Sequence, residues 1–173
     1  MKDLSLKIES TSGRGNFRIV KGSLPMLEIK YTSWFSGHAQ TRFNGYSIEM
    51  KPGNFWQTKF IILRNGMEAG EMVFHTKGFV TIHLFEGFSG HSANFQIKPK
   101  GFWKSHYLLL DEAENMVIRL QPKWVWRKFS HDYEVEIQRE AYDEAFLTEL
   151  LIYCGYACKV IQEKNAATTA AVT

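Results

Sequence analysis

The feature that most constrains this chain is a C-terminal segment, residues 141–163, whose pattern is helical and whose apolar side chains point in every direction. The segment contains no proline and a single glycine, Gly155. At about 100° per residue, its apolar positions cover the whole circumference of a helix rather than one stripe. Most of its charges lie toward its two ends. A helix of this kind must be enclosed by the rest of the chain.

Upstream of this segment, from residue 3 to about 138, apolar and polar residues alternate in short runs separated by turns. The clearest runs are 4–8, 27–31, 46–50, 80–84, 95–97 and 133–137. Period-two alternation predicts strands with one buried and one wet face, and it favours antiparallel pairing. Asn65-Gly66 between two such runs indicates a hairpin, and Asn44-Gly45 marks another turn or a bulge. We count about eleven or twelve strands at a spacing typical of sandwiches and barrels.

A closed barrel is the arrangement that covers such a helix on all sides and also removes exposed sheet edges. A barrel of about eight strands is filled by its own side chains, whereas a larger barrel leaves a lumen for the helix. We therefore predict a mainly β fold: a closed antiparallel barrel of about twelve strands around a central hydrophobic C-terminal helix. Residues 1–164 form one domain in this interpretation, and residues 165–173 form a frayed tail.

Three features point to a known family. They are the meander of strands, a strand and turn that contain Trp103, Tyr107, Leu109 and Asp111, and the final hydrophobic helix over residues 142–161. In these features the chain resembles the tubby C-terminal-like superfamily, and most closely its LURP-one-related and phospholipid scramblase-like group. The resemblance implies a barrel around the C-terminal helix and contact with phosphoinositides or other phospholipids.

Composition and termini narrow the possible classes. The chain of 173 residues has two cysteines, which excludes a disulfide scaffold and favours a reducing, cytoplasmic setting. A net charge of +3 is too small to indicate a nucleic-acid binder by itself. No apolar run follows the early lysines, so no signal peptide is expected. The longest apolar run, residues 150–158, is far shorter than the roughly 20 residues of a transmembrane helix.

Several groups combine residue types that occur in catalytic or metal sites. Cys154 and Cys158 lie one helical turn apart, His75, His83 and His91 recur every eight residues, and Ser130-His131-Asp132 resembles a triad. The cysteines could form half of a soft-metal site, but free cysteines are more often small buried residues. Adjacent strand residues point to opposite faces, so a contiguous triad cannot converge. We therefore predict no catalytic residue, metal or cofactor.

The segment most indicative of binding is residues 96–130, where seven basic and three acidic residues give a net charge of +4. Its basic residues, the predicted contacts for anionic headgroups, are Lys98, Lys100, Lys104, Arg119, Lys123, Arg127 and Lys128. Trp103, Trp124 and Trp126 are the predicted membrane-interface aromatics. The alternative is a solvated barrel wall, with lysines outside and tryptophans covering the lumen.

These observations favour a non-enzymatic, cytoplasmic and peripheral binding module that recognises anionic phospholipid headgroups or a protein partner through a basic outer wall. A helix in the lumen leaves no room for the ligand of a lipocalin-like carrier. Two other classes stay open: an enzyme acting at a barrel mouth, and a nucleic-acid-binding protein.

Overall fold

The computed structural model describes residues 5–13, 15–33, 36–85, 93–101, 106–138 and 142–172. Within these ranges twelve strands pair antiparallel in chain order, and β1 pairs with β12 to close a barrel. The strands are β1 (Leu6–Ser10), β2 (Phe17–Lys21), β3 (Leu24–Ser33), β4 (His38–Phe43), β5 (Tyr46–Pro52), β6 (Lys59–Arg64), β7 (Met67–Phe74), β8 (Val80–Leu84), β9 (Ala93–Lys100), β10 (His106–Leu110), β11 (Met116–Val125) and β12 (Ser130–Ile137). A 3₁₀ turn, η1 (Trp126–Lys128), joins β11 to β12, and the helix α1 (Glu144–Val172) ends the chain.

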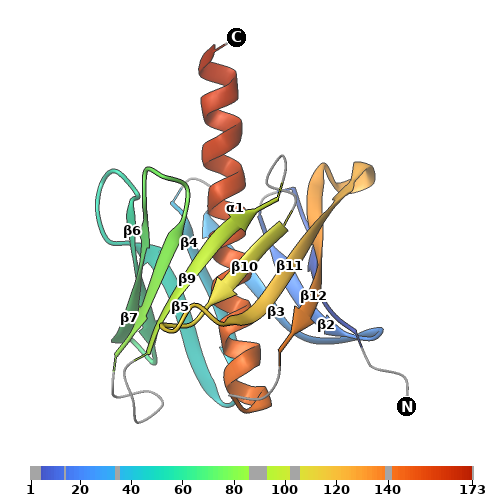
Figure 1. Cartoon of the computed structure of the whole chain (residues 1–173), viewed down its shortest axis with the longest axis vertical. Coiled ribbons are helices and arrows are strands. Elements are labelled where there is room, and N and C mark those ends of the chain that lie inside the picture. The colour runs from blue at the N-terminus through green and yellow to red at the C-terminus, as the bar shows by residue number, and fades with distance from the viewer. Residues whose placement is uncertain are drawn as a thin grey trace.

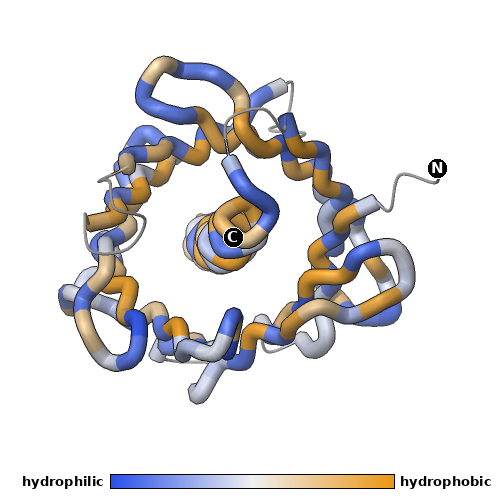
Figure 2. Tube along the Cα trace, turned by 90° about the horizontal axis from the view of Figure 1, so that it is seen from below, coloured by the Kyte–Doolittle hydropathy of each residue, from blue (hydrophilic) through white to orange (hydrophobic). Residues whose placement is uncertain are grey.

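The helix α1 runs through the middle of the barrel, as predicted (Figure 1). Seen along the barrel axis, the strands form a ring around it (Figure 2). Residues 147–161 of α1 are all buried, on every side of the helix. The strands present alternate residues to it: in β8, Val80, Ile82 and Leu84 are buried, whereas the residues between them are half-exposed. The predicted fold class is therefore confirmed.

The two Asn-Gly sequences lie where the sequence predicted turns. Asn44-Gly45 joins β4 to β5, and Asn65-Gly66 joins β6 to β7. Both residues of each pair have positive φ, between 48° and 81°. A type I′ hairpin requires this combination, which asparagine tolerates and glycine adopts freely.

The helix differs from its predicted bounds of 141–163. It begins at Glu144, where Asp143 acts as the N-cap and its Oδ1 accepts a hydrogen bond of 2.8 Å from the Phe146 amide. It also continues through the segment predicted to be a frayed tail and ends at Val172. Because the enclosed turns already provide the helix nucleus, the alanine-rich residues that follow extend it at little cost. This extension is exposed and projects beyond the barrel (Figure 1).

A buried ionic cluster ties the first half of α1 to the barrel. The Glu149 carboxylate accepts hydrogen bonds from Arg64 at 2.7 Å, Tyr46 at 3.1 Å and Tyr153 at 2.5 Å. The Arg64 guanidinium also lies 3.8 Å from the centroid of the Tyr46 ring. The buried carboxylate therefore has the partners that make its burial tolerable.

Gly155 marks a close approach of α1 to the wall. A Cβ atom at this position would lie 2.5 Å from Cε2 and 2.8 Å from Cζ of Phe17, a fully buried side chain of β2. Since the ring is packed in the core, it has little room to move aside. The helix therefore needs a residue without a side chain here.

We predict that Gly155→Ala lowers the free energy of unfolding by about 1 kcal/mol or more, because overpacking outweighs the roughly 1 kcal/mol that alanine gains over glycine as a helix former. Urea unfolding followed by circular dichroism measures the effect. The control is Thr168→Ala on the exposed extension of α1, which should not lower stability. A Gly155→Ala protein at least as stable as the parent would contradict the close contact.

Candidate functional site

Three of the predicted basic residues, Lys98, Arg119 and Lys123, lie on one outer wall. Leu108 of β10 pairs with Lys98 of β9 on one side and with Arg119 of β11 on the other, so all three lie in one row across neighbouring strands. Lys123 follows on β11, Lys100 ends β9, and Arg127 and Lys128 belong to η1. The predicted residues Lys104 and Trp103 lie outside the described residues, as does His91.

Acidic residues face most of this basic set. The ion pairs are Lys98–Glu114 at 3.2 Å, Arg119–Glu136 at 3.9 Å, Lys128–Asp132 at 3.3 Å, and Lys123–Glu134. Three of the four acidic partners belong to β12, which follows the segment of net charge +4 in the sequence. Exposed ion pairs of this kind contribute about 0–1 kcal/mol each to stability, but their charges still cancel at a distance. The wall is therefore far less cationic than the net charge of residues 96–130 suggests.

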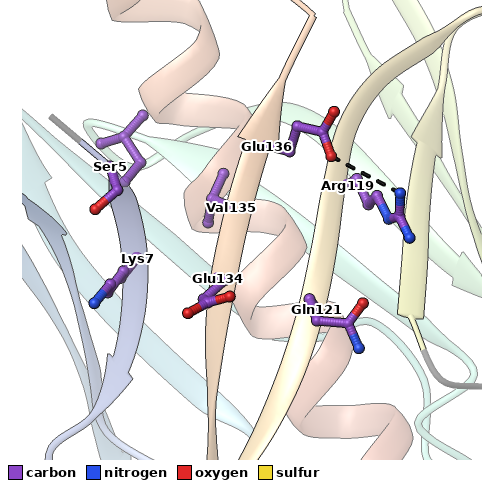
Figure 3. A pocket seen from close by; sticks show the side chains of 8 residues that line it. Ser5, Lys7, Arg119, Gln121, Glu134, Val135 and Glu136 are labelled. Carbon is purple, nitrogen blue, oxygen red and sulfur yellow. Dashed lines mark ion pairs between the residues drawn. The ribbon is translucent and has the colours of Figure 1, made fainter. Parts of the chain in front are cut away.

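A shallow hollow of about 500 Å³ on the wall confirms this mixed character. It lies over β1, β12 and β11, and its side chains include two cations, Lys7 and Arg119, and two anions, Glu134 and Glu136 (Figure 3). A surface that alternates both signs has no preference for an anion. The described part of the wall around this hollow therefore does not favour an anion.

A different surface combines exposed aromatic residues with positive charge. It is the end of the barrel from which α1 emerges, which we call the helix-exit end. The loop between β5 and β6 (residues 53–58), the turn between β7 and β8 (residues 75–79) and η1 all lie at this end, around the projecting helix (Figure 1). Lys164 of α1 confirms the placement, since its Nζ donates a hydrogen bond of 2.7 Å to the Gln57 carbonyl oxygen.

Four aromatic side chains are almost fully exposed at the helix-exit end, and we call them the rim aromatics. They are Phe55 (88% exposed), Trp56 (78%), Trp126 (76%) and Phe129 (78%). The first two lie on the β5–β6 loop and the others beside the β11–β12 connection, so two clusters flank the mouth of the barrel from well-separated strands. Exposed aromatic groups on this scale mark interaction surfaces more often than chance exposure.

The two described tryptophans of the basic segment, Trp124 and Trp126, do not cover the lumen. Trp126 is exposed and Trp124 is half-exposed, and their rings meet edge to face at a centroid distance of 5.8 Å. The aromatic side chains among the largest fully buried ones are instead Tyr133, Tyr153, Tyr156, Phe17, Phe60 and Phe95. Sequence reasoning missed Phe55, Trp56 and Phe129. The available signal for the first two was an aromatic pair directly after Gly53-Asn54, inside a turn sequence.

The two ends of the barrel differ in charge. Among the described loop residues at the helix-exit end there is no aspartate or glutamate, while Lys77 and Arg127 lie there. Lys128 is paired with Asp132, and Glu163 of α1 lies beside Lys164 at the same end. At the opposite end, the described loop residues include Asp111, Glu112, Glu114 and Asp143. An anionic partner is therefore attracted to the helix-exit end and repelled from the other.

Phe129 adopts a left-handed backbone conformation, with φ of 47° and ψ of 42°. It occupies the position after a helical turn where glycine is the usual residue. A residue with a side chain costs roughly 1–2 kcal/mol in this conformation. Backbone strain of this kind is often found at functional sites. Here the strained residue carries an aromatic ring that is exposed to solvent.

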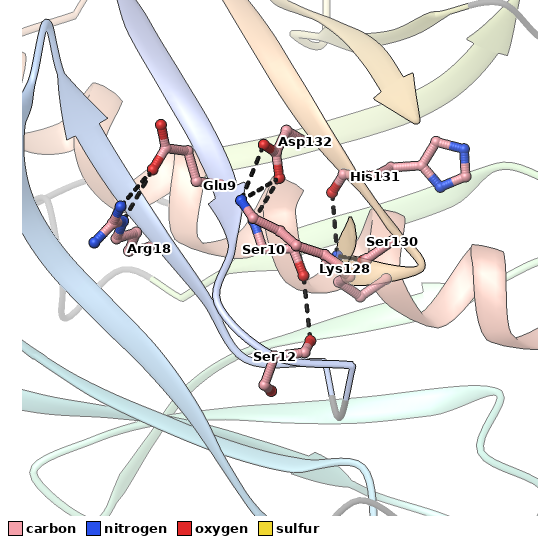
Figure 4. A network of polar contacts seen from close by, with 9 residues as sticks. Glu9, Ser10, Ser12, Arg18, Lys128, Ser130, His131 and Asp132 are labelled. Carbon is pink, nitrogen blue, oxygen red and sulfur yellow. Dashed lines mark hydrogen bonds and ion pairs between the residues drawn. The ribbon is translucent and has the colours of Figure 1, made fainter. Parts of the chain in front are cut away.

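Within the described part of the chain, the residues that suggested a catalytic or metal site do not converge. Asp132 accepts hydrogen bonds from the Ser10 amide at 2.8 Å and from Lys128, while the His131 ring points away from it toward Trp124 (Figure 4). The triad therefore does not form, as the alternation of strand faces predicted. Cys154 and Cys158 are both fully buried in the core. His75 stacks on Phe79 in the β7–β8 turn.

Lys159 is a buried cation inside the mouth of the barrel. Its Nζ donates hydrogen bonds to Ser130 Oγ at 2.7 Å and to the His131 carbonyl oxygen at 3.3 Å. Desolvation lowers the pKa of Lys159 to about 8, although the negative charges of Asp132 and Glu163 oppose the shift. The lysine ties the second half of α1 to the β11–β12 hairpin, as Glu149 ties the first half to β5 and β6.

We predict that the free energy of unfolding of the parent gains about 2 kcal/mol over that of Lys159→Met between pH 7 and 9.5, from the titration of this lysine. The ordinary pKa of lysine is 10.5 and that of folded Lys159 is about 8, so the unfolded chain binds more protons in this window. Raising the pH therefore relieves the cost of the buried charge. Urea unfolding at each pH should show this growing difference between the parent and Lys159→Met. Burial raises the pKa of Cys154 and Cys158, which lowers stability as the pH rises, but it does so equally in both proteins. Equal slopes for the two proteins would refute the assignment.

No protein-family model matches the chain, and neither a curated protein nor a solved structure matches it significantly. Within the described part of the chain, no helix has the length and hydropathy that a bilayer crossing requires.

Proposed function

We propose that this protein is a non-enzymatic module that docks peripherally on anionic phospholipid surfaces through its helix-exit end. The observation that carries the proposal is the coincidence of four exposed rim aromatics with loops that, where described, contain no acidic residue. The proposal moves the predicted contact from the outer wall to the end of the barrel. Lys98, Arg119 and Lys123 then take no part in docking, because paired acidic residues neutralise their charges.

The chemistry of the rim suits the boundary between headgroups and acyl chains. Tryptophan favours this boundary because its ring is apolar and its N–H can still reach water or a headgroup. Each lysine or arginine near an anionic surface adds about 1 kcal/mol of attraction. Two aromatic clusters on separate strands also define a plane, so docking would fix the orientation of the barrel axis.

The exposed part of α1 is compatible with this orientation. It projects between the two clusters, and no residue after Lys164 is charged. At 1.5 Å per residue, positions 165–172 extend for about 12 Å. An uncharged segment of this length can enter the headgroup region without burying an unpaired side-chain charge.

The resemblance to tubby C-terminal-like proteins, drawn from the sequence, implies phospholipid contact as well. It remains a prediction, and the proposal does not depend on it. The physical argument stands on the rim aromatics and on the difference in charge between the two ends.

We predict that the double substitution Trp56→Ser and Trp126→Ser weakens binding to vesicles of mixed phosphatidylcholine and phosphatidylserine at least tenfold. The reason is the loss of about 1 kcal/mol or more of partial burial per ring. Co-sedimentation at low salt measures the partition coefficient. The matched control is Leu24→Ser with Met67→Ser, which removes two side chains of similar exposure, 71% and 73%, at the opposite end.

The control protein should bind like the parent. Failure of the parent to prefer anionic over neutral vesicles would reject the proposal, and binding to a nucleic acid or a protein with no vesicle binding would favour those classes instead. Loss of binding in both double variants would point to a general effect on the fold.

A second pair of variants separates the rim from the wall. We predict that Arg127→Gln weakens binding to anionic vesicles about fivefold, from the loss of about 1 kcal/mol. Lys123→Gln on the outer wall should leave binding unchanged, because Glu134 already neutralises that lysine. The same co-sedimentation assay applies, and added salt should reduce the difference between parent and Arg127→Gln. A larger effect from Lys123 than from Arg127 would return the contact to the wall.

A further inference from the structure

A small pocket of about 230 Å³ lies at the helix-exit end, between α1 and the β7–β8 turn. Its apolar surface comes from Phe74, Phe79, Val80 and Ile161. Phe74, Val80 and Ile161 belong to the buried core, so this side of the pocket is rigid. Its polar surface comes from His75, Thr58, Thr76, Lys164 and Asn165.

Lys164 gives the pocket a positive charge with no opposing carboxylate. Its Nζ donates to the Gln57 carbonyl oxygen at 2.7 Å and lies 5.3 Å from the centroid of the Phe74 ring. None of the residues that line the pocket is acidic, and no carboxylate in the described ranges lies within ion-pair distance of Lys164. An ammonium group has three donors, so this one retains capacity for a further acceptor. Burial lowers the pKa of Lys164, and a bound anion would offset that cost.

We propose that this pocket binds a small monocarboxylate with a short aliphatic or aromatic body, its carboxylate at Lys164 and its body against Phe74, Val80 and Ile161. A single ammonium suits a monoanion better than a dianionic phosphate. The apolar wall requires a ligand that also has apolar surface to bury. At about 30 Å³ for each water-sized group, the volume accommodates about eight non-hydrogen atoms, the size of hexanoate.

This site differs in kind from the docking surface, because its ligand is a soluble small molecule. None of the four rim aromatics lines the pocket. Membrane docking and ligand binding can therefore each fail without the other. The test of the pocket uses no membrane.

The experiment is a titration of the full chain with hexanoate, followed by NMR of the Val80 and Ile161 methyl groups. Hexanol has the apolar chain without the carboxylate, so it measures how much the charge contributes to affinity. Inorganic phosphate has negative charge without an apolar chain, so it measures whether charge alone is sufficient. We expect saturable methyl shifts with hexanoate, at least tenfold weaker binding of hexanol, and no methyl shift with phosphate. Equal affinity for hexanoate and hexanol, or no saturable shift with hexanoate, would overturn the proposal.

Two lysine variants complete the test. Lys164→Met keeps the length of the side chain and removes its charge, so it should reduce hexanoate affinity to that of hexanol. Lys77→Met removes an exposed lysine from the β7–β8 turn without changing the residues that line the pocket, and it should leave affinity unchanged. Unchanged binding in Lys164→Met, or an equal loss in Lys77→Met, would also overturn the proposal.

Discussion

Mutual enclosure of the helix α1 and the barrel is the constraint on which the rest of this structure depends. The helix is apolar on every side over residues 147–161, so it cannot remain in water. A barrel of twelve strands is too wide to be filled by its own side chains, so another element must fill its lumen. Each element therefore supplies what the other lacks, and neither is expected to be stable alone.

Two buried charges fix the position of the helix within the barrel. Glu149 is held by Arg64 and two tyrosines, and Lys159 is held by the β11–β12 hairpin. A shift of the helix along its axis would separate both groups from their partners and leave unpaired charges in the core. Gly155 adds a steric requirement between them. These contacts fix the position of the helix along the barrel axis, and the helix fills the lumen. Binding must therefore take place at the outer surface or at the mouths of the barrel.

The same arrangement makes the two mouths chemically different. In an antiparallel meander, every second connection lies at the same end, so residues far apart in sequence gather there. At the end where α1 emerges, these connections bring together Phe55, Trp56, Trp126 and Phe129, and the acidic loop at Asp111 lies at the other end. The helix adds Glu163, Lys164 and an uncharged extension to the first of these ends. Function is proposed there because, among the described residues, that end combines exposed aromatic side chains with loops that contain no acidic residue.

The sequence by itself determined the properties that depend on near neighbours. Period-two alternation showed the strands, Asn-Gly pairs showed the turns, and the helix without a polar face required an enclosing barrel. The tertiary structure alone decided which charges meet: Lys123 and Arg119 are matched by Glu134 and Glu136 of β12, which lie outside the basic segment. Strand register and barrel closure set those distances, and no local pattern encodes them. The grouping of aromatic residues around one mouth was hidden from the sequence for the same reason.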